Sequence, residues 1–203
     1  MSPTNGTNID LLWRGPFQIG NLKSRVGNKL SEFVEPHVYC TVCEYDGSRN
    51  GSLNIIYLGK AQNFYIRMFQ HYRGFLGFEY LLRDDGGQLA YKVTDEEYFD
   101  WMDDIDYRIK AAIDEAKRVQ FFCARCELEL LNIIESALIN RLKDRAKENL
   151  TGPLKCDNSR REWHGWNGKH IAINNIAHDD FPSAGKFIER AFGDDLIEWG
   201  EEK

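Results

Sequence analysis

The stretch IIYLGKAQNFYIRMFQHY brings together several side chains that could carry out chemistry on an anionic substrate. It contains Tyr57, Lys60, Arg67 and His71, with Gly59 between the tyrosine and the lysine. A guanidinium such as that of Arg67 matches the oxygens of a phosphate bidentately. Arg67 and His71 are four residues apart in a helical pattern, so they share one helix face. On its own, however, such a pair is most often part of a solvated surface.

Glu135 is the second candidate, because it falls on the apolar stripe of the most strongly predicted helix, residues 127–149. It stands four residues after Leu131 and three before Leu138, on the face expected to be buried. A buried carboxylate costs roughly several kcal/mol unless something compensates its charge. Two explanations stay open: a glutamate at the edge of the stripe that reaches solvent or pairs with a cation, or a ligand for a hard divalent cation.

The elements that must position these residues follow from the hydrophobic pattern. β-branched and aromatic runs predict three strands, and the turn signals in DGSRNGS join the first two into a hairpin. Helical periodicity predicts a helix with Asn63 as its N-cap, and a later long helix. The fold class predicted is α/β (α+β), a small three-stranded antiparallel central sheet flanked by helices. The strands are expected at 37–45, 53–59 and 118–126, and the helices at 63–75, 127–149 and, near the end of the chain, 185–192.

Three segments are predicted along the chain. Residues 1–31 are mixed and punctuated by Gly and Pro, so we expect an N-terminal arm over the core. Residues 32–151 form the predicted core, and residues 152–203 a C-terminal extension. Within the core, residues 84–118 are an acidic helical insert with eleven acids and five bases. Its apolar residues recur at helical spacing, which predicts an amphipathic helix, at Tyr98, Trp101, Ile105, Ile109 and Ile113.

Composition restricts the class of protein. Five cysteines, and a start without the pattern of a secretory signal, predict an intracellular (cytoplasmic) protein with reduced thiols. No apolar run is long enough to span a bilayer, so no membrane partner is expected. The net charge of −6 does not exclude nucleic acid, because residues 141–170 hold eight bases against four acids. A bound polyanion responds to that local field.

Taken in order, these motifs resemble the GIY-YIG nuclease family. Val38–Tyr39 stands for the first motif and Tyr57–Leu58–Gly59 for the second. Arg67 on the helix, His71 four residues later and Glu135 on the long helix follow in the family's order. Lys60 matches a lysine frequent in the small type II restriction endonuclease branch, and Asn149 is favoured over Asn158 as the terminal asparagine. The glycine of the first motif is His37 here, and seventeen residues separate the two motif tyrosines.

The resemblance implies a divalent-metal-dependent endonuclease that hydrolyses DNA phosphodiester bonds, of the sequence-specific restriction type, and a homodimer is expected if it cuts both strands. Tyr39 would be the general base, with Lys60 a contender, because a nearby cation can lower the pKa of a phenol from about 10. Arg67 would hold the phosphate, and Glu135 would bind one Mg²⁺ or Mn²⁺. Tyr57 and His71 would position phosphate and water through hydrogen bonds.

The tail NSRREWHGWNGKH mixes basic, aromatic and amide side chains, which suits contacts to phosphates and bases. A tail packed over the core through its tryptophans explains the same composition. The DNA-binding residues predicted there are Arg160, Arg161, Trp163, His164, Trp166 and Lys169.

Two rival interpretations remain. Cys40 with Cys43, and Cys123 with Cys126, have the C-x-x-C spacing of a zinc site. Residues three apart in a strand point to opposite faces, however, which favours ordinary buried thiols. The other rival is a catalytically silent nucleic-acid-binding module, or a protein-interaction domain, on the same fold.

Overall fold

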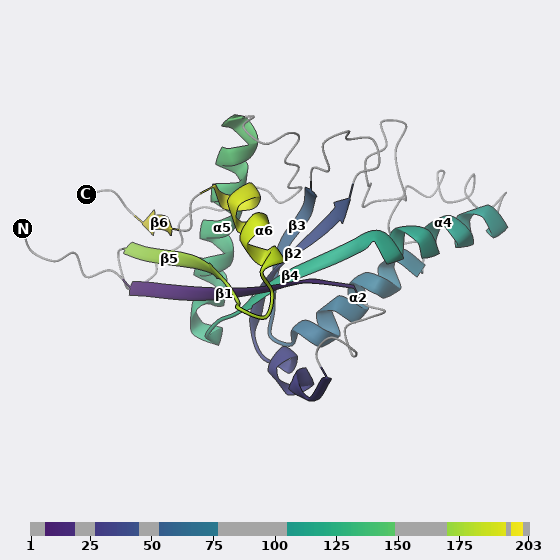
Figure 1. Cartoon of the computed structure of the whole chain (residues 1–203), viewed down its shortest axis with the longest axis horizontal. Helices are drawn as coiled ribbons and strands as arrows, with labels where there is room; N and C mark the ends of the chain where they lie inside the picture. Colours follow the sequence, from purple (N-terminus) through teal and green to yellow (C-terminus); the bar gives the residue numbers. More distant parts are fainter. Residues whose placement is uncertain are drawn as a thin grey trace, which may run out of the picture.

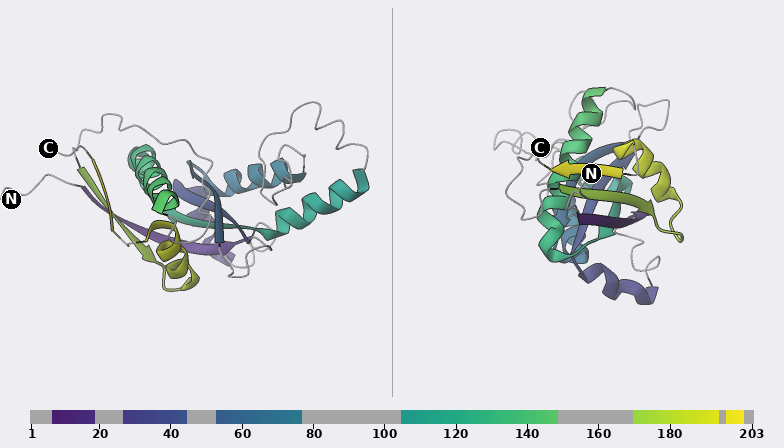
Figure 2. Two further views of the ribbon diagram at one scale, coloured as in Figure 1. Left: turned by 90° about the horizontal axis from the view of Figure 1, so that it is seen from above. Right: turned by 90° about the vertical axis from the view of Figure 1, so that its left-hand side faces the viewer.

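The computed structural model describes residues 7–18, 27–44, 53–76, 105–148, 170–193 and 196–200. These residues form a six-stranded mixed sheet in the order β3-β2-β4-β1-β5-β6, and the sheet curls into a half-barrel (Figures 1 and 2). The α+β class agrees with the prediction, but the small three-stranded antiparallel sheet is wrong. The strands are β1 (Thr7–Phe17), β2 (His37–Glu44), β3 (Leu53–Ala61), β4 (Val119–Arg125), β5 (His170–Ala177) and β6 (Leu196–Gly200).

The three strands missing from the prediction come from the two ends of the chain. β1 lies in the segment expected to be an arm, yet it pairs antiparallel with β4 and parallel with β5. β5 and β6 lie in the segment expected to be an extension, and they pair antiparallel with each other. β1 therefore lies between β4 and β5, so strands from both terminal segments belong to the same sheet as the predicted hairpin. Pairing between strands that are more than 150 residues apart leaves no local signal in the sequence.

β1 changes partner along its length, and a glycine marks the change. The register with β4 shifts between Arg14 and Phe17, and Gly15 has φ +138°. A Cβ added to Gly15 would lie 2.6 Å from the Phe121 carbonyl oxygen. The close approach of β1 and β4 therefore requires glycine at this position.

β2 and β3 form the antiparallel hairpin that the sequence predicts. Tyr39 lies opposite Gly59, and Val38 lies opposite Lys60. Directly opposed residues share a face and successive residues alternate, so Tyr39 and Lys60 point to opposite faces of the sheet. Among the described strands β3 ends the sheet, so Lys60 lies on an edge strand.

One face of the sheet is covered by the 3-10 helix η2 (Gly27–Val34) and by the helices α2 (Phe64–Leu76) and α4 (Ile105–Arg118). Asn63 caps α2 as predicted, because its Oδ1 accepts a hydrogen bond from the Ile66 amide at 3.0 Å. We call the buried apolar cluster on this face the α2-side core. Its largest fully buried side chains are Phe17, Phe33, Tyr39, Phe64 and Phe121.

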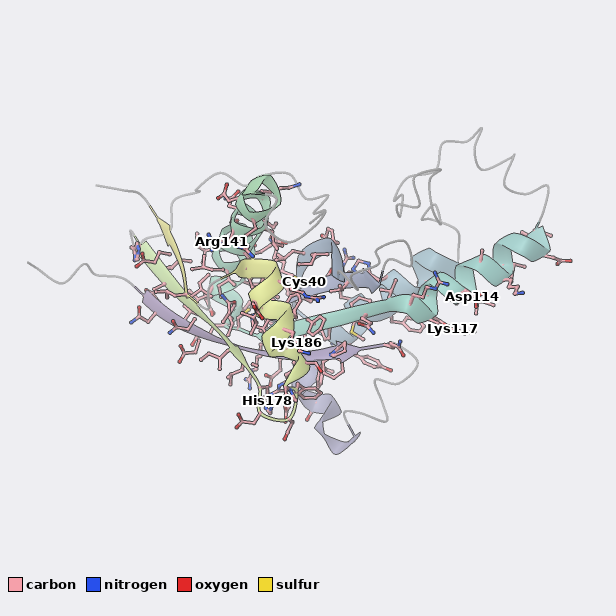
Figure 3. The ribbon with its side chains drawn as sticks, turned by 45° about the horizontal axis from the view of Figure 1, so that its top comes forward. Cys40, Asp114, Lys117, Arg141, His178 and Lys186 are labelled. Carbon is pink, nitrogen blue, oxygen red and sulfur yellow. The ribbon has the colours of Figure 1, made fainter. Side chains whose placement is uncertain are left out.

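The opposite face carries α5 (Leu131–Glu148), preceded by the short 3-10 helix η3 (Leu128–Leu130), and α6 (Ser183–Phe192). Both α5 and the helix near residues 185–192 were predicted. Arg141 of α5, labelled in Figure 3, donates from Nε to the Phe192 carbonyl at the end of α6 at 2.7 Å. We call the apolar cluster on this face the α5-side core. It includes Val38, Leu58, Phe122, Ile134, Leu138, Ile139, Leu142 and Phe187.

The predicted acidic insert lies only partly within the described residues, where α4 accounts for its last part. Ile109 and Ile113, expected on the buried face, are exposed, and Ala112 and Ala116 are buried instead. The face that contacts the sheet was therefore predicted wrongly. An exposed ion pair of 3.6 Å joins Lys117 Nζ to Asp114 Oδ1 on this helix (Figure 3). No described helix has the length and apolar composition needed to cross a membrane.

Candidate functional site

Tyr39 is the centre of a polar network within the α2-side core. Its ring is fully buried. Its hydroxyl oxygen lies 2.9 Å from Arg67 Nε, which donates to it, and 2.8 Å from His71 Nε2. The first turns of α2 place Arg67 and His71 on the helix face toward the sheet, as their spacing predicts. A strand residue and two helix residues thus meet at one oxygen atom.

Burial sets the charge state of this network. The pKa of His71 is lowered to about 4, because burial penalises the imidazolium and the Arg67 cation repels it. The imidazole is therefore neutral at pH 7. When its own proton is on Nδ1, a neutral His71 accepts a hydrogen bond from the Tyr39 hydroxyl at Nε2. The pKa of Arg67 is raised: burial opposes its charge, but the nearby hydroxyls of Tyr39 and Tyr57, both hydrogen-bonded to it, outweigh that effect.

Gly59 lets this tyrosine lie against the backbone of β3. A Cβ built on Gly59 would lie 2.8 Å from the Tyr39 hydroxyl oxygen and 2.4 Å from a ring carbon of Tyr57. Any side chain at residue 59 would displace one of the two tyrosines. Tyr57 is half-buried, and its ring centroid lies 6.1 Å from that of Tyr39 and 5.8 Å from that of His71. The motif glycine is therefore explained by packing against both motif tyrosines.

Lys60 and Glu135 form a second polar group on the opposite face of the sheet. Lys60 Nζ lies 2.5 Å from Glu135 Oε2. The Glu135 side chain is 6% exposed and that of Lys60 is 36% exposed. Of the two explanations open for Glu135, the structure supports pairing with a cation, and that cation is the lysine of the second motif. The pair lies beside the α5-side core, where Val38 and Leu58 flank Lys60 on the same face.

The predicted site residues therefore divide into two groups. We call Tyr39, Tyr57, Arg67 and His71 the tyrosine cluster, and Lys60 with Glu135 the edge pair. Both groups include a residue of β3, but successive residues of a strand point to opposite faces. Tyr57 and Lys60 are three residues apart, so their sequence spacing contained this signal.

The groups around Glu135 show whether it could act as a metal ligand. The described residues contain no cluster of three or more His, Cys, Asp or Glu side chains. A Mg²⁺ ion that keeps several waters and binds substrate phosphate needs only one or two carboxylates. Glu135 fits that role as the protein's carboxylate, and the half-exposed Lys60 ammonium is the group that an ion would displace from it or share it with.

Sequence reasoning missed Gln70, which contacts the tyrosine cluster through Arg67, and several predicted site residues lie outside the described part of the chain. Gln70 Oε1 accepts a hydrogen bond from Arg67 NH1 at 3.0 Å, and its i+3 spacing from Arg67 was the available signal. Asn149 lies outside the described residues. The same holds for the predicted DNA-binding residues Arg160, Arg161, Trp163, His164, Trp166 and Lys169.

Two further sequence features have a structural explanation. His37, which stands where the first motif has glycine, is buried, stacks on Phe33 and contacts the Glu35 carbonyl through Nδ1 at 2.8 Å. Burial lowers its pKa to about 4. Cys40 belongs to the α5-side core and Cys123 to the α2-side core, so these two thiols face opposite sides of the sheet.

The tyrosine cluster can hold an anion at Arg67, and His71 can orient the Tyr39 hydroxyl through a hydrogen bond. The edge pair can neutralise charge or exchange its lysine for another cation. Comparisons with protein-family models, with curated proteins and with solved structures gave no match for this chain.

Proposed function

We propose that this protein is a divalent-metal-dependent endonuclease that hydrolyses DNA phosphodiester bonds. The observation that carries the proposal is the hydrogen-bonded series Arg67–Tyr39–His71, held against the backbone of Gly59. It combines a cation for a phosphate, a phenol and a neutral imidazole at hydrogen-bonding distance. Hydrolysis of a phosphodiester requires a binding group for the phosphate, a base for water and charge stabilisation of the leaving oxygen.

Tyr39 would be the general base. Its oxygen accepts a hydrogen bond from the Arg67 guanidinium, which favours the phenolate over the phenol. His71, neutral at pH 7, accepts a hydrogen bond from the phenol at Nε2 and so orients the hydroxyl. In its phenolate form Tyr39 would accept a proton from the attacking water.

Arg67 would bind the phosphate. An arginine has five N–H donors, and Tyr39, Tyr57 and Gln70 do not use all of them. The side chain is half-buried, so part of the guanidinium remains open to a ligand. The hydrogen bonds to its neighbours hold it in place, which reduces the entropy lost when a phosphate binds.

Glu135 would carry one Mg²⁺ or Mn²⁺, which supplies charge neutralisation at the phosphate and at the leaving oxygen. The tyrosine cluster and the edge pair lie on opposite faces of β3, and β3 is the last of the described strands. We therefore propose that the scissile phosphate binds at the outer edge of β3, from which both faces can be reached. Lys60, half-exposed on that strand, would contact the DNA backbone there.

The proposal includes three further parts: the substrate is double-stranded DNA, the activity is sequence-specific as in restriction enzymes, and a homodimer cuts both strands. The basic and aromatic tail residues at 160–169 would supply contacts to DNA. A nuclease of this kind would act inside the cell.

Incubation of supercoiled plasmid with the wild-type protein and Mg²⁺ or Mn²⁺ tests the proposal. We expect nicked or linear products, no products with EDTA, and discrete bands if the enzyme is sequence-specific. For a Tyr39→Phe variant in this assay, the matched control is Tyr65→Phe, which removes the hydroxyl of an exposed tyrosine on α2 outside the cluster. DNA binding without cleavage under any metal would instead identify a silent binding module. If the protein neither binds nor cleaves DNA, a protein-interaction domain is the remaining interpretation.

A further inference from the structure

The first half of β1 has one free edge within the described part of the chain. β1 pairs with β5 from Thr7 to Trp13, but its pairing with β4 begins only at Trp13. β4 ends at Arg125, after which the chain turns into η3 and α5. Figure 1 shows β1 continuing beside β5 past the end of β4. No described strand therefore pairs with residues 7–11 on the β4 side.

The backbone groups on this edge can be assigned by alternation. The Trp13 carbonyl accepts a hydrogen bond from the His178 amide at 2.9 Å, so Trp13 directs its backbone groups toward β5. Neighbouring residues of a strand direct their N–H and C=O groups to opposite sides. Asn8 and Asp10 therefore present theirs to the side from which β4 is missing, whereas Leu12 lies opposite Arg125, the last residue of β4. The backbone groups of Asn8 and Asp10 are those that an added strand would bind.

A groove runs along this free edge. Its volume is about 930 Å³, and it lies between residues 7–14 of β1 and residues 125–130 at the end of β4 and in η3. The free stretch of β1 is about 17 Å long at about 3.4 Å per residue. A groove of this volume and length accommodates a short extended peptide, a shape that matches β-strand addition to an exposed sheet edge.

The charges around the groove select the kind of peptide. Its two arginines are engaged: Arg14 pairs with Glu32 and Arg125 pairs with Glu35. The exposed Glu127 and Glu129 form no ion pair within the described part of the chain. Asp10 adds a further carboxylate, hydrogen-bonded only to the Asn174 amide among the described residues. The groove is therefore acidic and favours a ligand with basic side chains.

Apolar surface lines the same groove. Leu12 on β1 is 46% exposed, and Leu128 in η3 is 48% exposed. A bound strand places alternate side chains on its two faces, so some can cover these leucines while others approach the carboxylates. We propose that this groove binds an extended segment of a partner protein, with alternating basic and apolar residues, as an added strand on β1. The proposal is independent of any nuclease activity.

The first test uses fluorescence anisotropy with a labelled hexapeptide of alternating lysine and valine. We expect saturable binding of this probe, and at least tenfold weaker binding of two control peptides. One control alternates glutamate and valine, and the other carries backbone N-methyl groups that cannot pair with a strand edge. Equal binding of the N-methylated peptide would overturn strand addition, and absence of binding by the lysine peptide would overturn the site.

Asn8→Pro removes a backbone N–H that faces the groove and that forms no hydrogen bond in the β1–β5 pairing. We expect it to weaken peptide binding at least tenfold, whereas Asn8→Ser, which keeps the N–H, binds like the wild type. The double variant Glu127→Lys, Glu129→Lys should lose the lysine peptide and gain the glutamate peptide. Unchanged binding by Asn8→Pro would contradict the proposal.

Amide hydrogen exchange in the wild-type protein gives a readout that does not depend on how the variants fold. On adding the lysine peptide, the Asp10 amide should become at least tenfold more protected, and the Leu11 amide, already directed toward β5, should not change. Increased protection at both amides or at neither would contradict the assigned edge. Self-association of the protein that Asn8→Pro abolishes would show that a second copy, not a peptide, uses this edge.

Discussion

The tyrosine cluster and the edge pair share one strand but have different physical character. In the cluster, a buried phenol, a neutral imidazole and a half-buried guanidinium share hydrogen bonds around one oxygen atom. In the edge pair, a buried carboxylate is balanced by a half-exposed ammonium. Under the proposed function, the first arrangement would supply a base and a phosphate ligand, and the second would hold a metal ion beside or in place of its lysine. One sequence signature therefore corresponds to two groups of residues on two faces of a sheet.

Substitution in the edge pair should have the largest effect on cleavage. Glu135→Gln keeps the size of the side chain but removes the charge that a divalent cation needs. We expect metal-dependent cleavage to fall below detection while DNA binding persists, measured by plasmid cleavage and by gel shift. Glu189→Gln on α6, an exposed glutamate, is the matched control. Cleavage by Glu135→Gln at the wild-type rate would reduce the edge pair to a structural ion pair.

Arg67→Lys tests whether the cluster needs a guanidinium rather than a charge. Lysine keeps the positive charge but cannot serve Tyr39, Tyr57 and Gln70 and also bind a phosphate in a fixed plane. We expect the cleavage rate to fall by about 10²–10³-fold, the usual loss when one stabilising donor is removed. The comparison is Arg73→Lys, an exposed arginine on the same helix. Equal rates for the two variants would separate Arg67 from the chemistry.

The pH dependence of stability should come from the α2 face. The pKa values of His71 and His37 are lowered to about 4 from their usual value near 6.5. The unfolded chain then binds more protons than the folded one between these values, so stability falls as pH falls from about 6.5 to about 4. Each histidine contributes up to about 3 kcal/mol to that loss.

Urea unfolding at pH 7, 5.5 and 4.5 measures this effect. His71→Gln keeps an acceptor for Tyr39 but does not titrate, so its free energy of unfolding should vary less with pH than that of the wild type. An equally steep dependence in the variant would show that His71 is not a source of the pH effect.

Gly59→Ala should have the smallest effect, and it probes the contact between β3 and the two tyrosines. The added methyl would overlap Tyr57 and the Tyr39 hydroxyl, so we expect a loss of about 1–3 kcal/mol in unfolding free energy. Gly185→Ala on α6 is the control, since its Cβ would lie 3.8 Å from Ala177. That substitution should be neutral or stabilising, because alanine favours helix. Equal stability of both variants would remove the packing role of Gly59.

Local elements were predictable, and their assembly was not. The β2–β3 hairpin, β4, α2 and α5 follow from alternation, turn residues and helical periodicity near the residues concerned. β1 and β5 were missed because their parallel pairing depends on partners that no local pattern reveals, and β6, which pairs antiparallel with β5, was missed with it. The buried face of α4 was predicted wrongly because Ala112 and Ala116, rather than the larger Ile109 and Ile113, are buried.

The candidate site was predictable in its members but not in its arrangement. Spacing placed Arg67 beside His71, and the helix pattern buried Glu135, as the structure has them. The division between two faces followed from the three-residue spacing of Tyr57 and Lys60. Applied to the cysteines, the same rule gave the arrangement found for Cys123 and Cys126, which contact opposite cores.

The central claim is that Tyr39 is the base of a phosphodiesterase site. Its most direct test is the single-turnover cleavage rate of Tyr39→Phe with saturating DNA and Mg²⁺, beside Tyr65→Phe. The account predicts a rate about 10²–10⁴-fold below wild type with unchanged DNA affinity, because only the hydroxyl is lost. A Tyr39→Phe rate equal to wild type, in a folded protein that cleaves DNA, would contradict it.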